Sequence, residues 1–336
     1  MQESYRPELK AHILTDLSNR VREIRHSQEY WESPVGGGLM TAIRYLRDFA
    51  HIYEIATTQL NRLESKVSFL DPQEQGGEYR LSEEKQMFDF ETFGFYQTYL
   101  NVPVWLAGLK VTVKQGPNRV IRSQDTTQLG VNAKMPSESA LQRYREIFVK
   151  ANTATVQRRA VRAQVDLRAT ATANSLAAGE GESEGESFLR SLININESSE
   201  QQQTGIRLIR GRFWIYRYDA NSRLPEDAEP EIPVAKEQGA VRSRSSITGS
   251  EVHSDHVPLP FDIPPVDSRI ETGVYYMVAE ITFEIASGSH RDVWQMLVEL
   301  ETNSILYLRP MSAHVNGYVY QKDPITKTGT TTPTST

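Results

Sequence analysis

Residues 93–113 read FGFYQTYLNVPVWLAGLKVTV, and this stretch decides the fold class of the chain. Apolar and polar side chains alternate on both sides of the NVP sequence at 101–103, which predicts two strands joined by a turn. The QGPN sequence at 115–118 predicts a hairpin loop, and residues 119–127 are expected to return as a third strand. The chain is therefore expected to contain an antiparallel meander.

A helix is predicted directly after the meander. Pro136 and Ser137 mark its start, with Ser137 as the N-cap. Its buried side is expected to consist of Ala140, Tyr144, Ile147 and Phe148. We expect this helix to cover one face of the meander, which is an α+β arrangement. Further strands are predicted at residues 206–218, 275–285, 294–300 and 305–308.

The N-terminal part of the chain carries two apolar stripes. The stripe within residues 5–30 consists of Leu9, Ile13, Leu17, Val21 and Ile24. Pro and Gly residues at 34–38 interrupt the chain. The next stripe consists of Leu39, Ile43, Leu46, Ala50, Tyr53, Leu60, Leu63 and Val67. Because the spacing is close to helical, we predict an N-terminal helical hairpin that docks on the rest of the chain or on a partner.

The domain organisation follows from these patterns and from local composition. Residues 174–204 are rich in Ser, Gly, Glu and Gln, and residues 225–268 contain many prolines, so both predict long loops. We expect a helical hairpin at 1–80, a first α+β module at 81–172, a low-complexity linker at 173–204, a second α+β module at 205–326 that includes the loop 225–268, and a disordered tail at 327–336.

Composition limits the classes of function. The formal net charge is -6, so no overall positive field attracts the chain to nucleic acid or to an anionic membrane. No segment approaches the run of about 18 apolar residues that a membrane helix needs. The start of the sequence lacks the pattern of a secretory signal, which predicts cytoplasmic synthesis, with non-classical export or association with a particle left open. Cys is absent, so thiol chemistry is excluded.

Metal chemistry has one candidate in the sequence. A zinc peptidase needs two His residues one helical turn apart with a Glu beside the first, and the chain contains no such HExxH motif. His253, Asp255 and His256 form the one His cluster. They are a weak candidate for a metal site, because they lie in the Pro-rich loop without a further ligand at a suitable spacing, so a solvated loop is favoured. We therefore predict no catalytic residues and no cofactor.

Two basic stretches were weighed as binding surfaces. Arg158, Arg159, Arg162 and Arg168 are typical of the solvated face of a helix, although binding of an anionic partner stays open. Residues 210–218, RGRFWIYRY, interleave Arg with aromatic side chains, as a nucleic-acid-binding sheet does. Given the acidic net charge, we favour a strand whose Phe213 and Ile215 face the core while Trp214 and Tyr216 pack elsewhere.

Two parts of the chain contain short motifs in a fixed order. The first set comprises Gln97, Asn101, Pro103, Val104 and Trp105, followed by Ser137 and Ala140 in the predicted helix. The second set comprises Trp294, Glu299 and Asn303, followed by Gly317, Asp323 and Pro324. Together they resemble the start and the end of the propeptide region, with its FTP and PepSY modules, of fungalysin and thermolysin-like zinc metallopeptidases.

The resemblance covers about half of the chain and leaves residues 1–90 without a counterpart. Where the family has a Thr-Gly turn, this chain has Asn303-Ser304. The chain ends about where the protease domain of such a protein would begin. The residues expected to maintain the modules, through core packing or turn geometry, are Gln97, Pro103, Trp105, Trp294 and Pro324.

The resemblance implies a non-catalytic module that binds, chaperones or inhibits a zinc metallopeptidase domain. The alternative is a structural subunit of a larger assembly, such as a phage-like or contractile injection particle, which the apolar stripes of the N-terminal hairpin favour. An enzyme with a metal at His253 and His256 ranks last. Either leading hypothesis implies a protein partner, without nucleic acid or membrane insertion, and a homo-oligomer is compatible with both.

Overall fold

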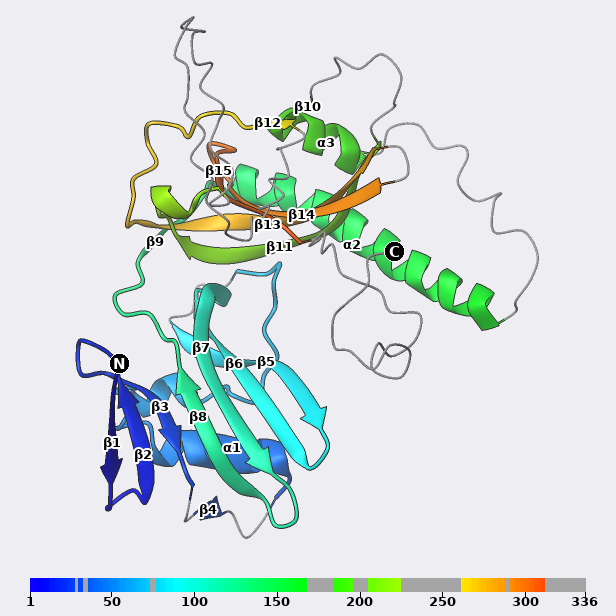
Figure 1. Cartoon of the computed structure of the whole chain (residues 1–336). Helices are drawn as coiled ribbons and strands as arrows, with labels where there is room; N and C mark the ends of the chain where they lie inside the picture. Colours follow the sequence, from blue (N-terminus) through cyan, green and yellow to red (C-terminus); the bar gives the residue numbers. More distant parts are fainter. Residues whose placement is uncertain are drawn as a thin grey trace, which may run out of the picture.

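The computed structural model describes residues 1–27, 30–32, 36–72, 77–167, 184–195, 205–224, 261–287 and 290–311. These residues form an α+β fold that is mostly β-sheet, with few helices. Figure 1 shows two lobes, each with a sheet and at least one helix. We call residues 1–132 the N-terminal lobe and residues 133–311 the C-terminal lobe.

The sheet of the N-terminal lobe contains eight of the described strands. They are β1 (Gln2–Arg6), β2 (Ala11–Thr15), β3 (Val21–Arg25), β4 (Trp31–Glu32), β5 (Glu78–Met87), β6 (Phe90–Tyr99), β7 (Val102–Lys114) and β8 (Arg119–Asp125). The path runs β1-β2-β3-β8-β7, β6 joins β5 to β7, and β4 pairs with β8. The meander of β6, β7 and β8 was predicted from the alternating sequence and is confirmed.

The predicted N-terminal helical hairpin is not confirmed. Residues 2–25 form the antiparallel strands β1, β2 and β3 instead, with Ile13 on β2, Val21 and Ile24 on β3, and Leu9 and Leu17 in the connecting turns. A spacing of four residues fits a strand as well as a helix, because four is also two strand periods. The register of β2 against β3 shifts at Arg22, and this bulge lets both Val21 and Ile24 face the core.

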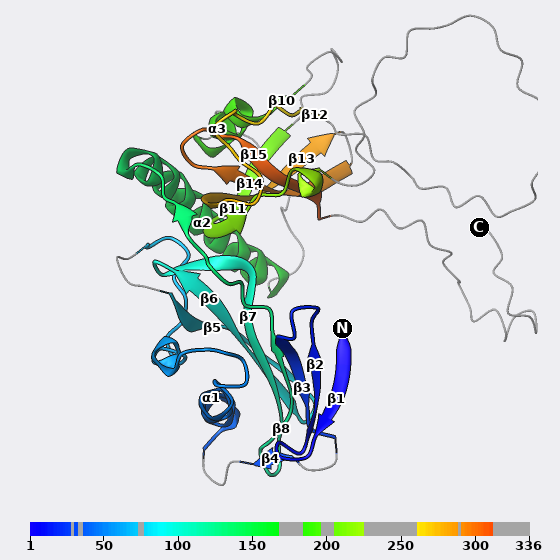
Figure 2. The same cartoon turned by 90° about the vertical axis from the view of Figure 1, so that its left-hand side faces the viewer.

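The second stripe forms one short helix, α1 (Gly38–Asp48), followed by irregular chain and the 3-10 turn η1 (Thr57–Leu60). Glu54 adopts a left-handed backbone conformation with φ 58°, which is incompatible with a continuous helix. Figure 2 shows α1 against one face of the N-terminal sheet. Ile43 and Leu46 of α1 are buried in the same core as Ile13 and Ile24, so both stripes contribute to the core of the lobe, although Leu17 of the first stripe is exposed.

The C-terminal lobe has an antiparallel sheet in the order β11 (Gly205–Arg217), β13 (Tyr275–Ser287), β14 (His290–Glu299) and β15 (Ile305–Pro310). The short strand β9 (Ala133–Lys134) pairs with β13, and β10 (Asn194–Ile195) pairs with β12 (Phe261–Asp262). The 3-10 turn η2 (Ala220–Ser222) follows β11. The predicted strands at 206–218, 275–285, 294–300 and 305–308 are thus confirmed.

The helix predicted after Ser137 exists as α2 (Glu138–Leu167), but it does not cover the meander. It packs on β11 of the C-terminal lobe together with α3 (Glu184–Leu192), and Tyr144 and Phe148 share the core of that lobe with Phe213. The predicted packing of this helix on the meander of the first module is therefore not confirmed. The apolar side of a helix shows which of its side chains must be buried. It does not show which sheet they pack against.

Strand β7 joins the two lobes. Its residues 109–114 pair with β8, whereas Val104 forms a parallel bridge with Ile215 of β11. Between these two regions Leu106 has φ 55° and Gly108 has φ 156°. A Cβ atom on Gly108 would lie 2.1 Å from the carbonyl oxygen of Phe95, so only glycine permits this close approach.

Some predicted regions lie partly or wholly outside the described residues. Residues 184–195 of the predicted linker form α3 and β10, and Leu189 and Leu192 are buried there. The rest of that linker, the loop from 225 to 260 and the tail at 327–336 lie outside the described residues.

Candidate functional site

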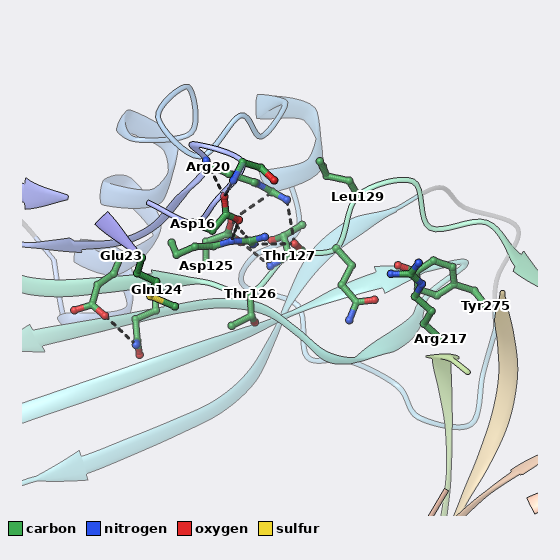
Figure 3. Close-up of a pocket in the computed structure, with 14 residues that line it drawn as sticks. Asp16, Arg20, Glu23, Gln124, Asp125, Thr126, Thr127, Leu129, Arg217 and Tyr275 are labelled. Carbon is green, nitrogen blue, oxygen red and sulfur yellow. Dashed lines mark hydrogen bonds and ion pairs between the residues drawn. The ribbon is translucent and has the colours of Figure 1, made fainter. Parts of the chain in front are cut away.

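A cleft of about 780 Å³ opens between the two lobes (Figure 3). The N-terminal lobe contributes the turn between β2 and β3 and the segment that runs from the end of β8 to residue 129. The C-terminal lobe contributes the end of β11 and the start of β13. The lining consists of Met1, Asp16, Ser18, Arg20, Arg22, Glu23, Gln124, Asp125, Thr126, Thr127, Gln128, Leu129, Arg217 and Tyr275.

The β2–β3 turn is held by Asp16. Its Oδ1 accepts hydrogen bonds from the backbone N–H groups of Ser18 (2.8 Å) and Arg20 (3.1 Å), the arrangement of an Asx turn. Its Oδ2 accepts from Nε of Arg22 at 2.8 Å. This hydrogen bond from Arg22 is the main reason that the pKa of Asp16 lies below its ordinary value of 3.8. The turn therefore presents Leu17, at its tip, in a fixed position.

The floor of the cleft is built on Asp125, at the end of β8. Its side chain is fully buried, and Oδ1 accepts from the backbone N–H of Thr127 at 2.8 Å. Oδ2 lies 3.3 Å from Nη2 of Arg20 and 3.6 Å from Nη1 of Arg22. Burial raises the pKa of the Asp125 carboxyl above 3.8, because desolvation outweighs the hydrogen bonds with Thr127 and the attraction of the two arginines.

The two arginines also hold the chain beyond β8. Nη1 of Arg20 and Nη1 of Arg22 both donate to the carbonyl oxygen of Thr127, at 3.1 and 3.2 Å. The Thr127 hydroxyl forms a 2.8 Å hydrogen bond with the hydroxyl of Tyr79. This segment is thereby fixed by side chains from the β2–β3 turn, from β3 and from β5, although it belongs to none of them.

Gln97, a residue singled out by the sequence resemblance, supports the wall of the cleft. Its amide makes two hydrogen bonds with the backbone of Gln128: Nε2 donates to the carbonyl oxygen (2.8 Å), and Oε1 accepts from the N–H (2.9 Å). Gln128 in turn donates from Nε2 to the carbonyl oxygen of Trp105 at 3.3 Å. Two motif residues of β6 and β7 therefore position a residue that lines the cleft.

The other motif residues near β7 lie at the junction of the lobes. Asn101 has φ 65° and donates from Nδ2 to the carbonyl oxygen of Asp71 at 2.8 Å. Pro103 is buried within the short stretch of β7 next to β11. The ring of Trp105 packs against Trp214 with a centroid separation of 5.0 Å. These residues connect the lobes without lining the cleft.

The last motif residues organise the turn between β14 and β15. Glu299 accepts hydrogen bonds from the backbone N–H groups that follow it, and Asn303 has φ 58°. Oδ1 of Asn303 accepts from the hydroxyl of Tyr144 at 2.8 Å, and the carboxylate of Glu301 accepts from the N–H and hydroxyl of Ser137. The turn therefore anchors the start of α2, a connection that sequence did not predict.

Trp294 is buried in the core of the C-terminal lobe, where its ring lies 5.5 Å from that of Phe261. Phe213 and Ile215 also lie in that core, and Trp214 and Tyr216 are buried on the opposite face of the sheet, as the packing interpretation of residues 210–218 predicted. Gly317, Asp323, Pro324, His253, Asp255 and His256 lie outside the described residues, as do Arg168 and the side chains of Arg158, Arg159 and Arg162.

The C-terminal wall of the cleft consists of Arg217 and Tyr275. Arg217 is exposed, donates from Nε to the carbonyl oxygen of Gly273 at 3.1 Å, and has its guanidinium 6.0 Å from the ring centroid of Tyr275. Within the described ranges, no Asp or Glu forms an ion pair with it. Figure 3 shows Arg217 across the cleft from Arg20 and Asp125.

Two exposed apolar side chains line this polar cleft, and a third lies in the adjoining turn. Leu17 is 100% exposed, Leu129 is 67% exposed and Met1 is 86% exposed. Leu129 and Met1 line the cleft, and Leu17 stands in the turn between the lining residues Asp16 and Ser18. The site therefore combines guanidinium and amide donors with an apolar rim, a combination suited to binding a peptide segment.

The described residues contain neither a cluster of metal ligands nor a membrane-spanning helix. In that part of the chain no group of three or more His, Asp or Glu side chains is arranged to hold a metal ion. None of its helices is long and apolar enough to cross a membrane.

Comparisons with known proteins show no family for this chain. No family model matches the chain, and no curated protein matches it. Among solved structures, the chain is similar to the Bacillus megaterium YpeB C-terminal domain, with 8% sequence identity and a TM-score of 0.25, over 93% of this chain and 89% of that one. We transfer no residue role from that protein.

Proposed function

We propose that the chain is a non-catalytic protein-recognition module whose cleft receives a segment of a protein partner. The observation that carries this proposal is the exposed Leu129, which lines the cleft, together with the exposed Leu17 of the adjoining β2–β3 turn and the arginines of the cleft. Exposed apolar side chains grouped around a cavity are typical of interaction sites. Burial of one leucine side chain contributes about 1.5–3 kcal/mol, so two such contacts supply a substantial part of a micromolar affinity.

The proposed partner is a zinc metallopeptidase domain. This class comes from the resemblance of the motif residues to propeptide modules, and Gln97, one of those residues, supports the cleft wall through Gln128. A partner segment in the cleft would bridge the two lobes and hold them in one relative position. Binding of this kind suits a module that templates folding or blocks access to a peptidase.

The alternative, a structural subunit of a larger assembly, stays a prediction, and the structure adds no observation in its favour. The feature that favoured it was a pair of apolar stripes in need of a partner. Their members Ile13, Ile24, Ile43 and Leu46 are buried inside the N-terminal lobe. Deletion of residues 1–70 is therefore expected to unfold this lobe, not to release an independent assembly element.

The test measures binding between the full chain and a purified thermolysin-like zinc metallopeptidase domain by biolayer interferometry. Leu17→Asp and Leu129→Asp are expected to weaken binding at least tenfold, because each places a charge where apolar burial is needed. Val149→Asp is the matched control, since Val149 is 48% exposed on α2, outside the cleft. Binding that is absent for the wild type, or unchanged in both leucine variants, would contradict the proposal.

A further inference from the structure

The arginines that line the cleft differ in whether they form an ion pair with a carboxylate. Arg22 is paired with Asp16 at 2.8 Å, and Arg20 is paired with Asp125 at 3.3 Å. Both arginines also donate to a backbone carbonyl oxygen. Arg217 has no such carboxylate among the described residues, so it is the arginine of the cleft that is open to an added anion.

The geometry of Arg217 prepares it for that anion. One edge of its guanidinium is fixed by the hydrogen bond from Nε to the carbonyl oxygen of Gly273, and its plane lies near the ring of Tyr275. The two Nη groups remain to donate. Because the side chain is already held in place, binding a ligand costs less side-chain entropy than it would for a free arginine.

The charges around the cleft favour a singly charged ligand. A carboxylate has one negative charge, which matches the guanidinium of Arg217, the one guanidinium of the cleft without an acidic partner among the described residues. Its two oxygens also match the planar fork of the guanidinium donors. A phosphate dianion would bring a second negative charge toward Asp16 and Asp125, which line the same cleft. The exposed leucines of the rim add a requirement for apolar side chains beside the carboxylate.

From these observations we infer that the cleft recognises an acidic peptide segment, in which Arg217 binds an Asp or Glu carboxylate and Leu17 and Leu129 contact its apolar neighbours. This inference rests on the proposed function, since it names the chemistry of the partner segment. The specificity resides in a residue at the end of β11 that belongs to the basic stretch 210–218 but to none of the motifs of the propeptide resemblance.

Selection from a random peptide library displayed on phage tests the inference with the full chain as bait. The wild type is expected to enrich peptides with one Asp or Glu flanked by apolar residues. Arg217→Glu is expected to enrich Lys or Arg at that position instead, because the charge of the recognising group is reversed. Arg207→Glu is the control, since Arg207 is exposed on the same strand but outside the cleft. Melting temperatures confirm that each variant is folded.

An enriched peptide, synthesised with a free or an amidated C-terminus, then distinguishes a side-chain carboxylate from a terminal one. Arg217→Gln is expected to weaken its binding about 10- to 100-fold, the range for loss of a hydrogen bond to a charged group. Peptides enriched without an acidic residue, or an unchanged preference in Arg217→Glu, would overturn the inference and leave the proposed function standing. A wild type that enriches no peptide would overturn both.

Discussion

Replacing Gly211 by Ala adds one methyl group where α2 packs against β11. The new Cβ atom would lie 2.0 Å from the nearest ring atom of Phe148, far inside van der Waals contact. Neither side can move easily, because Phe148 is fully buried and Asn152 holds the backbone of Gly211 through two hydrogen bonds of 3.0 and 3.1 Å. Overpacking of this kind costs about 1–3 kcal/mol of unfolding free energy.

The second variant, Phe148→Leu, removes the ring that causes the clash. Alone it is expected to cost about 1 kcal/mol, as a swap between apolar side chains of related volume. Combined with Gly211→Ala it gives the new methyl group room, so the double variant should lose at least about 1 kcal/mol less than the sum of the two single losses. Asn152 is kept unchanged throughout.

Urea denaturation followed by tryptophan fluorescence measures the effect, since the unfolding free energy depends linearly on urea concentration. The midpoint should fall in Gly211→Ala and recover in part in the double variant. Additive losses, or a loss below about 0.5 kcal/mol in Gly211→Ala, would refute the packing of α2 on β11, and with it the assignment of this helix to the C-terminal lobe.

Three other substitutions test separate features. Phe88→Asn should raise the melting temperature and increase the unfolding free energy by up to about 1 kcal/mol. Phe88 is 90% exposed and has φ 55°, a left-handed conformation that asparagine tolerates. An unchanged or lower melting temperature would contradict backbone strain at this position. Gln97→Ala should lose about 1–3 kcal/mol in urea denaturation through the two hydrogen bonds to Gln128, and a neutral result would remove its role at the cleft. Hydrogen bonds from Ser137 lower the pKa of Glu301 below 4.5, so its stabilisation is present above pH 4.5 and is lost as the pH falls through the folded pKa. Thermal melts should therefore show Glu301→Gln less stable than the wild type at pH 7, with a difference that shrinks as the pH is lowered below 4.5, whereas a constant difference would argue against this linkage.

The sheet was predictable where the sequence repeats with a period of two over a long run. Residues 93–113 alternate on both sides of a turn signal, so their pairing followed from the sequence. The start of the chain was not predictable in this way, because apolar residues four apart fit both a helix and a strand. The TDLSNR sequence at 15–20 contained the deciding signal, since Asp, Ser and Asn together mark a turn that a continuous helix excludes.

The burial of α2 was predictable, whereas its position was not. Tyr144 and Phe148 were expected on the buried side of the helix and are buried. The sheet that covers them is chosen by packing over long range: Asn303, which anchors the helix start, is 159 positions from Tyr144 along the chain. No local pattern reports such a contact.

The short motifs of the sequence included a residue that supports the wall of the cleft, Gln97, but not the arginines that line it. Gln97 was singled out because it belongs to a short local pattern, and its role is local too, as a clamp on the neighbouring chain. Arg20 acts on Thr127, which is 107 positions away, and Arg217 comes from another lobe. Each of these arginines looks like an ordinary charged residue of a strand until the sheets are assembled. Recognition by such a site depends on the relative position of the lobes. A change at the bend of β7 near Gly108, whose backbone hydrogen-bonds with the lining residue Thr126, should therefore alter binding although Gly108 does not itself line the cleft.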